Sequence, residues 1–314
     1  MELNEAKIPT MYFIGVSTGQ SSSKNIFPKW VETLQISPAR LIGIDLKIHD
    51  KPENYQKVIH FIKNDPLSLG ALVTTHKMDL MRACQDEFDE IDPLAFELGE
   101  VSSLYKRGGK LFARATDPEC GGMALENFLP PNYFSKFDSE LLILGSGGSA
   151  LALVWYFLQG PGKINAPDKI YVVNRSQGRL DHLVRLAEGW GSSSQIIPLV
   201  AHDSSVADKV IYSMNPGSLV VNATGLGKDA PGSPITDGAQ FPDGGFVWDF
   251  NYRGDLLFLE QATSQKNNRS LTLVDGWDYF VIGWTQVIAD IFDLDIPTKG
   301  HLYDILSQQA KERR

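Results

Sequence analysis

Residues 141–150 read LLILGSGGSA, an apolar run that leads into a glycine-rich turn and the start of a helix. Four consecutive apolar residues suit a buried strand of a parallel sheet, because both faces of such a sheet are covered. Glycines directly after the strand allow a tight turn and let backbone N–H groups approach a pyrophosphate at the positive end of the helix. Glycine is also used wherever φ must be positive, so the neighbouring sequence has to decide between a binding turn and a structural one.

A second apolar run, residues 170–173, follows at the distance that a strand–helix–strand unit requires. It ends in Asn174, Arg175 and Ser176, and Arg179 comes just beyond. A dinucleotide fold that binds NAD usually has an acidic residue here to hold the ribose hydroxyls, whereas arginine suits the 2′-phosphate of NADP. The sequence therefore predicts a dinucleotide-binding domain that takes NADP.

The composition is that of an ordinary globular protein. The chain has 314 residues, 43% hydrophobic and 21% charged, with a formal net charge of −9. It contains no basic run, so we expect no nucleic-acid partner. No apolar stretch approaches bilayer length and the first residues do not resemble a signal peptide, so we expect no membrane segment and a cytoplasmic location. The cysteines and histidines show no metal-ligand spacing, and no metal is predicted.

The residues before the glycine turn are numerous enough for a complete first domain that binds something other than the cofactor. Strands are predicted at 12–16, 41–45 and 70–74, helices at 53–63 and 78–88, and a hairpin around Gly108-Gly109. Strands separated by helices predict parallel pairing in this domain too.

We therefore predict an α/β fold of two domains with a cleft between them. The substrate-binding domain is expected to span residues 1–125, with a C-terminal helix over about 285–314 returning to it. The Rossmann-type NADP domain, with a parallel sheet, is expected to span residues 126–284.

Two residues at predicted strand ends have side chains that can move a proton. Lys77 follows the strand at 70–74, and Asp117 follows the second strand of the hairpin. Oxidation of an alcohol by a nicotinamide cofactor needs a group that takes the hydroxyl proton, and open α/β sheets bind ligands at the C-terminal ends of their strands. The alternative interpretations are a solvated surface lysine and an aspartate that caps a helix ahead of Pro118.

Two further positions leave their role open. Ser21 and Ser23 carry hydroxyls that suit a substrate carboxylate, or they belong to a cap at the start of the next helix. His76 either contacts substrate or packs beside Lys77, and the sequence does not choose.

Together these segments resemble the shikimate dehydrogenase family, including its quinate dehydrogenase relatives, over nearly the whole chain. The segments that carry the resemblance keep the family's order: residues 15–23, 73–77, 99–103, 115–117, 145–150, 174–179, 222–224, 249–252 and Gly276. The resemblance implies NADP as the cofactor and a place in the shikimate pathway of aromatic amino acid biosynthesis.

The resemblance also implies a role for individual residues. Lys77 and Asp117 would be the catalytic pair. The substrate would be bound by Ser21, Ser23, Thr74, Ser102 and Tyr252. The cofactor would be bound by Gly145, Ser146, Gly147, Gly148, Ser149, Asn174, Arg175, Ser176, Arg179, Asn222, Ala223, Thr224 and Gly276.

The chain departs from the family pattern where ring hydroxyls are contacted. Asparagine is usual at the positions of Leu72, Ser102 and Ala115, and glutamine is usual at Gly283, nearly one turn before Gln286. A substrate hydroxyl left unpaired in a closed pocket costs ~1–3 kcal/mol, so these changes predict that shikimate itself is not the best substrate.

The predicted function is the NADP-dependent interconversion of a secondary alcohol and a ketone on a carboxylated ring, of the shikimate/3-dehydroshikimate type. The partner is a small cyclic hydroxy acid, and the protein is expected to be a monomer or homodimer. Two alternatives stay open: the same chemistry on quinate, an aminoshikimate or another cyclitol acid, and a non-catalytic NADP-binding regulator of the same fold. Retention of Lys77 and Asp117 argues against the regulator.

Overall fold

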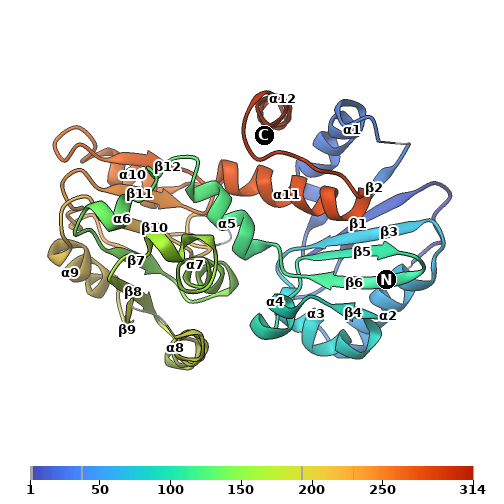
Figure 1. Ribbon diagram of the computed structural model, residues 1–314, viewed down its shortest axis with the longest axis horizontal. Coiled ribbons are helices and arrows are strands. Elements are labelled where there is room, and N and C mark those ends of the chain that lie inside the picture. The colour runs from blue at the N-terminus through green and yellow to red at the C-terminus, as the bar shows by residue number, and fades with distance from the viewer. Residues whose placement is uncertain (1–2, 37, 192–193, 229, 314) are drawn as a thin grey trace. The chain divides into compact units, whose positions relative to one another are not determined.

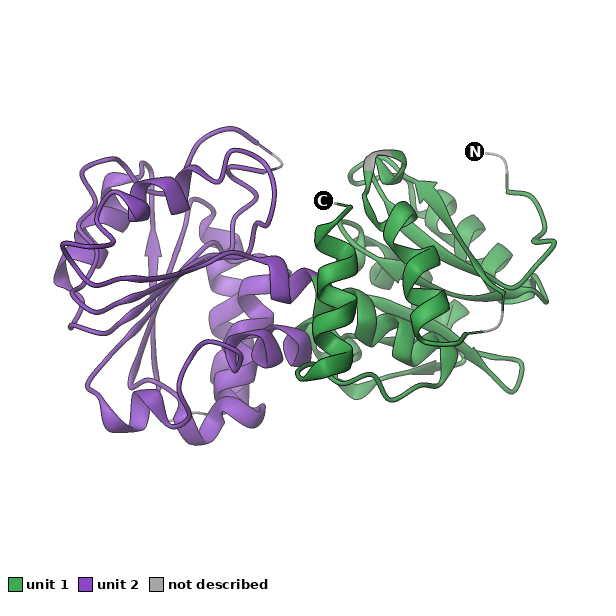
Figure 2. Cartoon of the chain, turned by 90° about the horizontal axis from the view of Figure 1, so that it is seen from above, with its two compact units in different colours: residues 1–117, 281–314 green, residues 118–280 purple. Residues whose placement is uncertain are grey.

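The computed structural model describes residues 3–36, 38–191, 194–228 and 230–313 (Figure 1). The chain divides into two compact units, coloured separately in Figure 2. Unit 1 comprises Met1–Asp117 and Val281–Arg314, and unit 2 comprises Pro118–Phe280. Both boundaries lie a few residues before the predicted ones, because one falls at the start of helix α5 (Asp117–Leu125) and the other inside helix α11 (Trp277–Phe292).

Unit 1 is built around a six-stranded sheet in the order β2-β1-β3-β5-β6-β4. Its strands are β1 (Thr10–Gly15), β2 (Arg40–Asp45), β3 (Ser68–Val73), β4 (Glu90–Ile91), β5 (Ser103–Arg107) and β6 (Lys110–Arg114). The predicted hairpin is confirmed, since β5 runs antiparallel to β6. The predicted parallel pairing holds for β1 with β2 and β3 and for β4 with β6, but not for β3 with β5, which are antiparallel. Gly108 and Gly109 have φ values of +57° and +79°, and the tight turn that they form reverses the chain between β5 and β6.

The helices of unit 1 each bury some of their residues. They are α1 (Ser23–Thr33), α2 (Pro52–Asn64), α3 (Lys77–Cys84), α4 (Pro93–Leu98) and α12 (His301–Lys311), with short 3₁₀ turns at Thr18–Gln20 and Gln85–Glu87. In α2, Tyr55, Val58, Ile59 and Ile62 are buried at helical spacing in the core of the unit. The C-terminal helix belongs to unit 1, since Trp30 Nε1 of α1 donates a hydrogen bond to the Leu306 carbonyl 2.9 Å away.

Unit 2 is built around a six-stranded sheet in the order β12-β11-β10-β7-β8-β9, and every pairing in it is parallel. Its strands are β7 (Leu141–Leu144), β8 (Lys169–Asn174), β9 (Gln195–Val200), β10 (Leu219–Asn222), β11 (Phe246–Asp249) and β12 (Thr272–Val274). The strand order reverses between β7 and β10, and open α/β sheets bind ligands at such a switch point.

The remaining helices flank the sheet of unit 2 (Figure 1). Besides α5 they are α6 (Tyr133–Lys136), α7 (Gly148–Leu158), α8 (Gln177–Trp190), α9 (Ser205–Ser213) and α10 (Leu257–Thr263), with a 3₁₀ turn at Pro161–Asn165. Among the described residues, no helix is both long and apolar enough to cross a membrane.

Candidate active site

Lys77 and Asp117 form an ion pair in unit 1, between Nζ and Oδ2. The sheet explains why residues so far apart in sequence meet. Since β5 is antiparallel to both β3 and β6, the latter two run in the same direction and end at one edge. Lys77 begins α3 just after β3, and Asp117 begins α5 just after β6. The predicted proton-transfer pair is therefore brought together at the C-terminal ends of its two strands.

The ion pair is largely withdrawn from solvent. The side chain of Lys77 is 21% exposed and that of Asp117 12% exposed. Two charges in this environment attract each other more strongly than on the surface, because less water screens them. The low exposed fraction of Lys77 contradicts its interpretation as a freely solvated side chain. The fraction that is still exposed leaves the pair open to a small molecule.

The segment before β5, residues 101–102, forms hydrogen bonds at Lys77 and next to Asp117. The Val101 N–H donates to the Lys77 carbonyl over 3.3 Å. The Thr116 N–H donates to Ser102 Oγ over 2.7 Å, and the two hydroxyls lie 2.9 Å apart. Ser102 thus positions the residue that precedes Asp117, and its hydroxyl is already engaged within the protein. Its predicted contact with a substrate ring stays a prediction and would require one of these bonds to be exchanged.

Ser21 and Ser23 lie together at the start of α1. Their hydroxyl oxygens are 2.7 Å apart, and the Ser23 N–H donates to Ser21 Oγ over 3.3 Å. The residue at the helix cap, Ser22, makes no capping hydrogen bond through its side chain. The preceding loop is anchored to β2, because Thr18 donates through both N–H and Oγ1 to Asp45 Oδ1, at 2.7 and 2.6 Å. This arrangement presents two hydroxyls at one place, as an anion such as a carboxylate requires.

Thr74 and His76 connect β3 to its neighbours. Thr74 donates to the Ile14 carbonyl through both its N–H, at 3.1 Å, and its hydroxyl, at 3.2 Å, which ties the end of β3 to β1. His76 is buried, and its Nδ1 lies 3.1 Å from the hydroxyl of Tyr55. One ring nitrogen of His76 is therefore engaged by Tyr55 of α2.

The positions that depart from the family pattern have distinct surroundings. Leu72 and Ala115 are buried in unit 1. A Cβ added at Gly283 would have no described heavy atom within 4 Å. Gln286 Nε2 donates to the Ile296 carbonyl over 2.9 Å, in the loop after α11. The side-chain amide of Gln286, which could replace the glutamine that the family has at Gly283, is therefore already engaged.

In unit 2, the glycine turn lies between β7 and α7, as predicted. Gly145 has a φ of +110°, and a Cβ at this position would come within 2.9 Å of the Ala223 carbonyl oxygen. Only glycine permits this approach of the turn to the loop after β10. Gly147 precedes the first residue of α7 and makes no side-chain cap, so the N–H groups of the first turn are available to an anion.

The end of β8 lies next to this turn. Asn174 Nδ2 donates to Ser146 Oγ over 2.6 Å. Ser176 precedes α8 without capping it through its side chain. Arg175 and Arg179 are exposed and, over the described part of the chain, neither forms an ion pair. Two arginines at the N-terminus of a helix provide the charge and the donors that a phosphate group needs.

A buried polar network fixes the loops after β10 and β11. Asn222 Oδ1 accepts hydrogen bonds from Thr224 N–H, at 3.0 Å, and Oγ1, at 2.6 Å, while its Nδ2 donates to Asp249 Oδ1 at 3.0 Å. The Asn251 N–H also donates to Asp249 Oδ1, at 2.9 Å. Burial raises the pKa of Asp249 to about 6, although the hydrogen bonds from Asn251 and Asn222 oppose the shift. The network holds Ala223 against the glycine turn.

Gly276 and Tyr252 lie in the same unit. A Cβ at Gly276 would come within 2.0 Å of the Phe250 carbonyl oxygen, so no other residue fits the turn before α11. The ring of Tyr252 stacks on Phe280 with centroids 4.3 Å apart. Tyr252 therefore belongs to unit 2, whereas Ser21 and Ser23, which are also predicted to bind the substrate, belong to unit 1.

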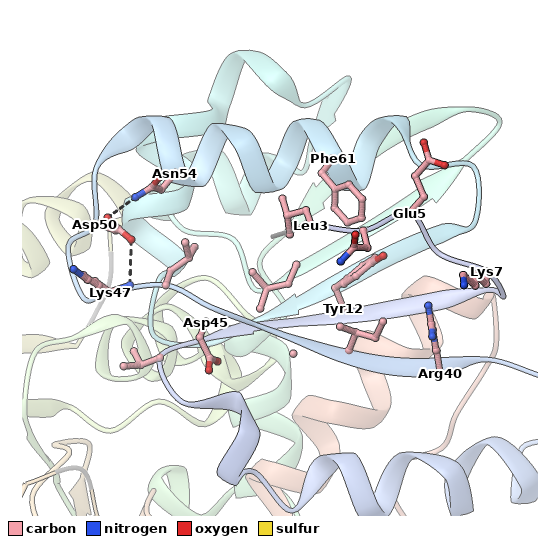
Figure 3. Close-up of a pocket in the computed structure, with 16 residues that line it drawn as sticks. Leu3, Glu5, Lys7, Tyr12, Arg40, Asp45, Lys47, Asp50, Asn54 and Phe61 are labelled. Atoms are coloured by element: carbon pink, nitrogen blue, oxygen red, sulfur yellow. Dashed lines mark hydrogen bonds between the residues drawn. The ribbon is translucent and has the colours of Figure 1, made fainter. Parts of the chain in front are cut away.

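A hollow of about 1070 Å³ lies elsewhere on unit 1, along β2 (Figure 3). Tyr12, Arg40 and Phe61 line it, and Asp50 at its rim accepts a hydrogen bond from Asn54 Nδ2 at 2.7 Å. None of the side chains predicted for catalysis or cofactor binding contributes to this hollow. We therefore do not assign it to the active site.

One ionisable residue beside the pair was missed from the sequence. Glu100, between α4 and β5, is 1% exposed and interacts electrostatically with both Lys77 and Asp117. The sequence could have indicated Glu100, because a charged residue directly before a predicted buried strand is unusual. Nowhere in the described ranges do three or more His, Cys, Asp or Glu side chains form a group that could hold a metal ion.

The two sheets define a two-unit α/β protein whose second unit has the topology of a dinucleotide-binding domain. No family model matches the chain. A shikimate dehydrogenase (NADP(+)) from Lactococcus lactis subsp. cremoris is 29% identical over 203 residues, which cover 63% of this chain and 67% of the relative. The enzyme of the same name from Dictyoglomus thermophilum is 28% identical over 238 residues, 73% of this chain and 75% of the relative. Over about two thirds of its length the chain is similar in sequence to curated shikimate dehydrogenases.

Solved structures share the whole fold at lower sequence identity. Shikimate dehydrogenase from Aquifex aeolicus aligns with a TM-score of 0.73 at 17% identity, covering 98% of this chain and 99% of the other. The Thermus thermophilus enzyme, solved with NADP(H) and shikimate, gives 0.69 at 20% identity, with 98% and 100% covered. A 5-ketofructose reductase from Gluconobacter gives 0.70 at 17% identity, with 98% and 99% covered, so the fold does not determine the substrate.

Proposed function

We propose that this chain interconverts a secondary alcohol and a ketone on a carboxylated ring with NADP as cofactor, the reaction between shikimate and 3-dehydroshikimate. The observation that carries the proposal is the Lys77–Asp117 ion pair at the edge of the unit 1 sheet. A binding protein without catalysis has no need to keep these two charges mostly withdrawn from water.

Unit 2 supports NADP as the cofactor. The glycine turn leaves open space at Gly147 for the close approach of a pyrophosphate, and the first turn of α7 offers N–H groups. Arg175 and Arg179 would hold the 2′-phosphate. When bound, NADP supplies the hydride acceptor for alcohol oxidation and the donor for ketone reduction.

In unit 1, Lys77 would exchange the proton of the reacting hydroxyl. In the direction of oxidation a neutral Lys77 accepts the proton at Nζ, and in the direction of reduction the ammonium donates it. Asp117 holds the lysine in place through Oδ2 and stabilises its charged form. Ser21 and Ser23 would donate hydrogen bonds to the ring carboxylate, and Thr74, Ser102 and Tyr252 complete the proposed substrate contacts.

The names of the curated relatives support shikimate over quinate or another cyclitol acid. The changed positions Leu72, Ser102, Ala115 and Gly283 are the reason to test substrates side by side. The cytoplasmic location and the choice between monomer and homodimer stay predictions.

The experiment is a measurement of kcat/KM for shikimate, quinate, an amino analogue and a carboxyl-free cyclitol, each with NADP⁺ and with NAD⁺. Turnover that requires both the ring carboxylate and NADP⁺ supports the proposal. Turnover of the carboxyl-free cyclitol at equal efficiency would contradict the roles of Ser21 and Ser23. Absence of turnover with every ring acid would favour the non-catalytic regulator.

A further inference from the structure

The backbone of unit 1 holds Glu100 next to the ion pair. Gly99, with a φ of +64°, ends α4 and turns the chain toward β5. The Glu100 N–H donates to the Ala95 carbonyl of α4 over 3.2 Å, and the Val101 N–H donates to the Lys77 carbonyl over 3.3 Å. The segment is thus fixed on both sides of Glu100, and on one side it is fixed to Lys77 itself.

The carboxyl group of Glu100 is in an unusual state for a buried group. The residue is 1% exposed, and within the described part of the chain nothing donates a hydrogen bond to Oε1. Buried polar atoms are almost always hydrogen-bonded, because an unpaired one costs free energy. An isolated structural role would favour an apolar side chain at this position, so the carboxyl needs another explanation.

The charges that act on Glu100 are Asp117 from the start of α5 and Lys77 from the start of α3. Burial raises the pKa of Glu100 to about 7; the negative charge of Asp117 adds to the rise and the positive charge of Lys77 opposes it. Two carboxyl groups and one ammonium thus interact electrostatically in unit 1, so the charge of Glu100 is coupled to the charges of the pair.

We propose that Glu100 is a positioning residue for the Lys77–Asp117 pair, whose buried carboxyl acts on the Lys77 ammonium and sets the pH range in which Lys77 exchanges its proton. The inference rests on the proposed function for its consequence in catalysis. It goes beyond that function because it gives the chain a third ionisable group that none of the assigned roles includes.

The sign of the effect follows from the charges. A Glu100 carboxylate stabilises the Lys77 ammonium and keeps Lys77 protonated to higher pH. Glu100→Gln removes this charge at nearly constant volume, so Lys77 should lose its proton at lower pH. A neighbouring opposite charge shifts a pKa by about 1 unit or more, and the expected change is therefore a downward shift of about one pH unit.

The test measures the titration of Lys77 without relying on turnover. The rate at which acetic anhydride acetylates Lys77 is followed by mass spectrometry between pH 6 and pH 11, since only the neutral amine reacts. The variants are E100Q, E100D and E100M, and the control is E53Q, which makes the same change at an exposed position in the first turn of α2. Methionine removes the charge in an apolar form if glutamine disturbs folding.

In E100Q and E100M, Lys77 should become reactive about one pH unit lower than in the parent protein, whereas E100D and E53Q should titrate as the parent does. The acid limb of kcat/KM for alcohol oxidation should move by the same amount. An unchanged Lys77 titration in both E100Q and E100M overturns the inference. Because the labelling needs no substrate, a shift in labelling without turnover of any ring acid would overturn the proposed function and leave the inference supported.

Discussion

Unit 1 and unit 2 both place their candidate residues at the C-terminal edge of a sheet, but they build the edge differently. In unit 2, the proposed pyrophosphate site is formed by one short turn and the backbone around it, with Gly145 pressed against Ala223. In unit 1, the site is formed by the side chains of Lys77, Glu100 and Asp117. Lys77 follows β3, Asp117 follows β6, and Glu100 follows α4. A backbone site tolerates few residue types, whereas a side-chain site depends on charge balance. The two units should therefore respond differently to substitution.

The largest effect is expected in the side-chain site. Lys77→Ala and Asp117→Asn should each reduce kcat by about 100-fold or more, the usual contribution of a positioned acid or base. Steady-state rates of NADPH formation measure this. Lys110→Ala, which breaks the exposed pair with Glu90, is the matched control and should retain full activity. Variants of Lys77 that keep most of the parent rate would remove the lysine from the mechanism.

The next effect distinguishes the two cofactors in unit 2. Arg175→Ala should weaken NADP⁺ binding about tenfold or more and leave NAD⁺ binding nearly unchanged, because a charge-assisted contact to phosphate contributes roughly 1.5–3 kcal/mol. Calorimetric Kd values for both cofactors test this. Arg185→Ala, exposed further along α8, should change neither value. If the parent protein binds NADP⁺ and NAD⁺ equally well, the assignment of Arg175 and Arg179 to a 2′-phosphate fails.

The smallest effect concerns the backbone of the turn. Gly145→Ala should lower stability by roughly 1–3 kcal/mol, since the alanine would adopt a left-handed φ and its Cβ would press on the Ala223 carbonyl. Gly147→Ala is the natural comparison, because Gly147 has a φ of −83° and open space around it. Thermal unfolding without cofactor should separate the two variants, and equal Tm values would show that the close approach at Gly145 is unimportant.

The contrast between the units also explains which features could be predicted from the sequence. The glycine turn and its strand form one contiguous pattern, so their local geometry follows from neighbouring residues. The same holds for α2, whose buried face is spaced at the helical period. The hairpin of β5 and β6 could also be predicted, from its two glycines, but the antiparallel pairing of β5 with β3 could not, because a strand pattern does not indicate which distant strand it joins.

Side-chain roles in unit 1 were harder to predict. Lys77 and Asp117 were proposed from their strand ends, which is a topological argument and needs no contact to be known. The hydrogen bonds of Ser102 with Thr116 and the electrostatic interactions of Glu100 with the pair depend on how β5 is inserted between β3 and β6. Contacts of this kind arise only when distant segments are fixed by tertiary structure.

The central claim is that Lys77 and Asp117 act as one unit, and a double-mutant cycle tests it most directly. The measurement is kcat for shikimate oxidation by NADP⁺ in the parent, Lys77→Ala, Asp117→Asn and the double variant. Residues that act together lose nearly all of their joint effect when either is removed, so the double variant should be little slower than the slower single variant. Losses that multiply fully in the double variant would contradict the account.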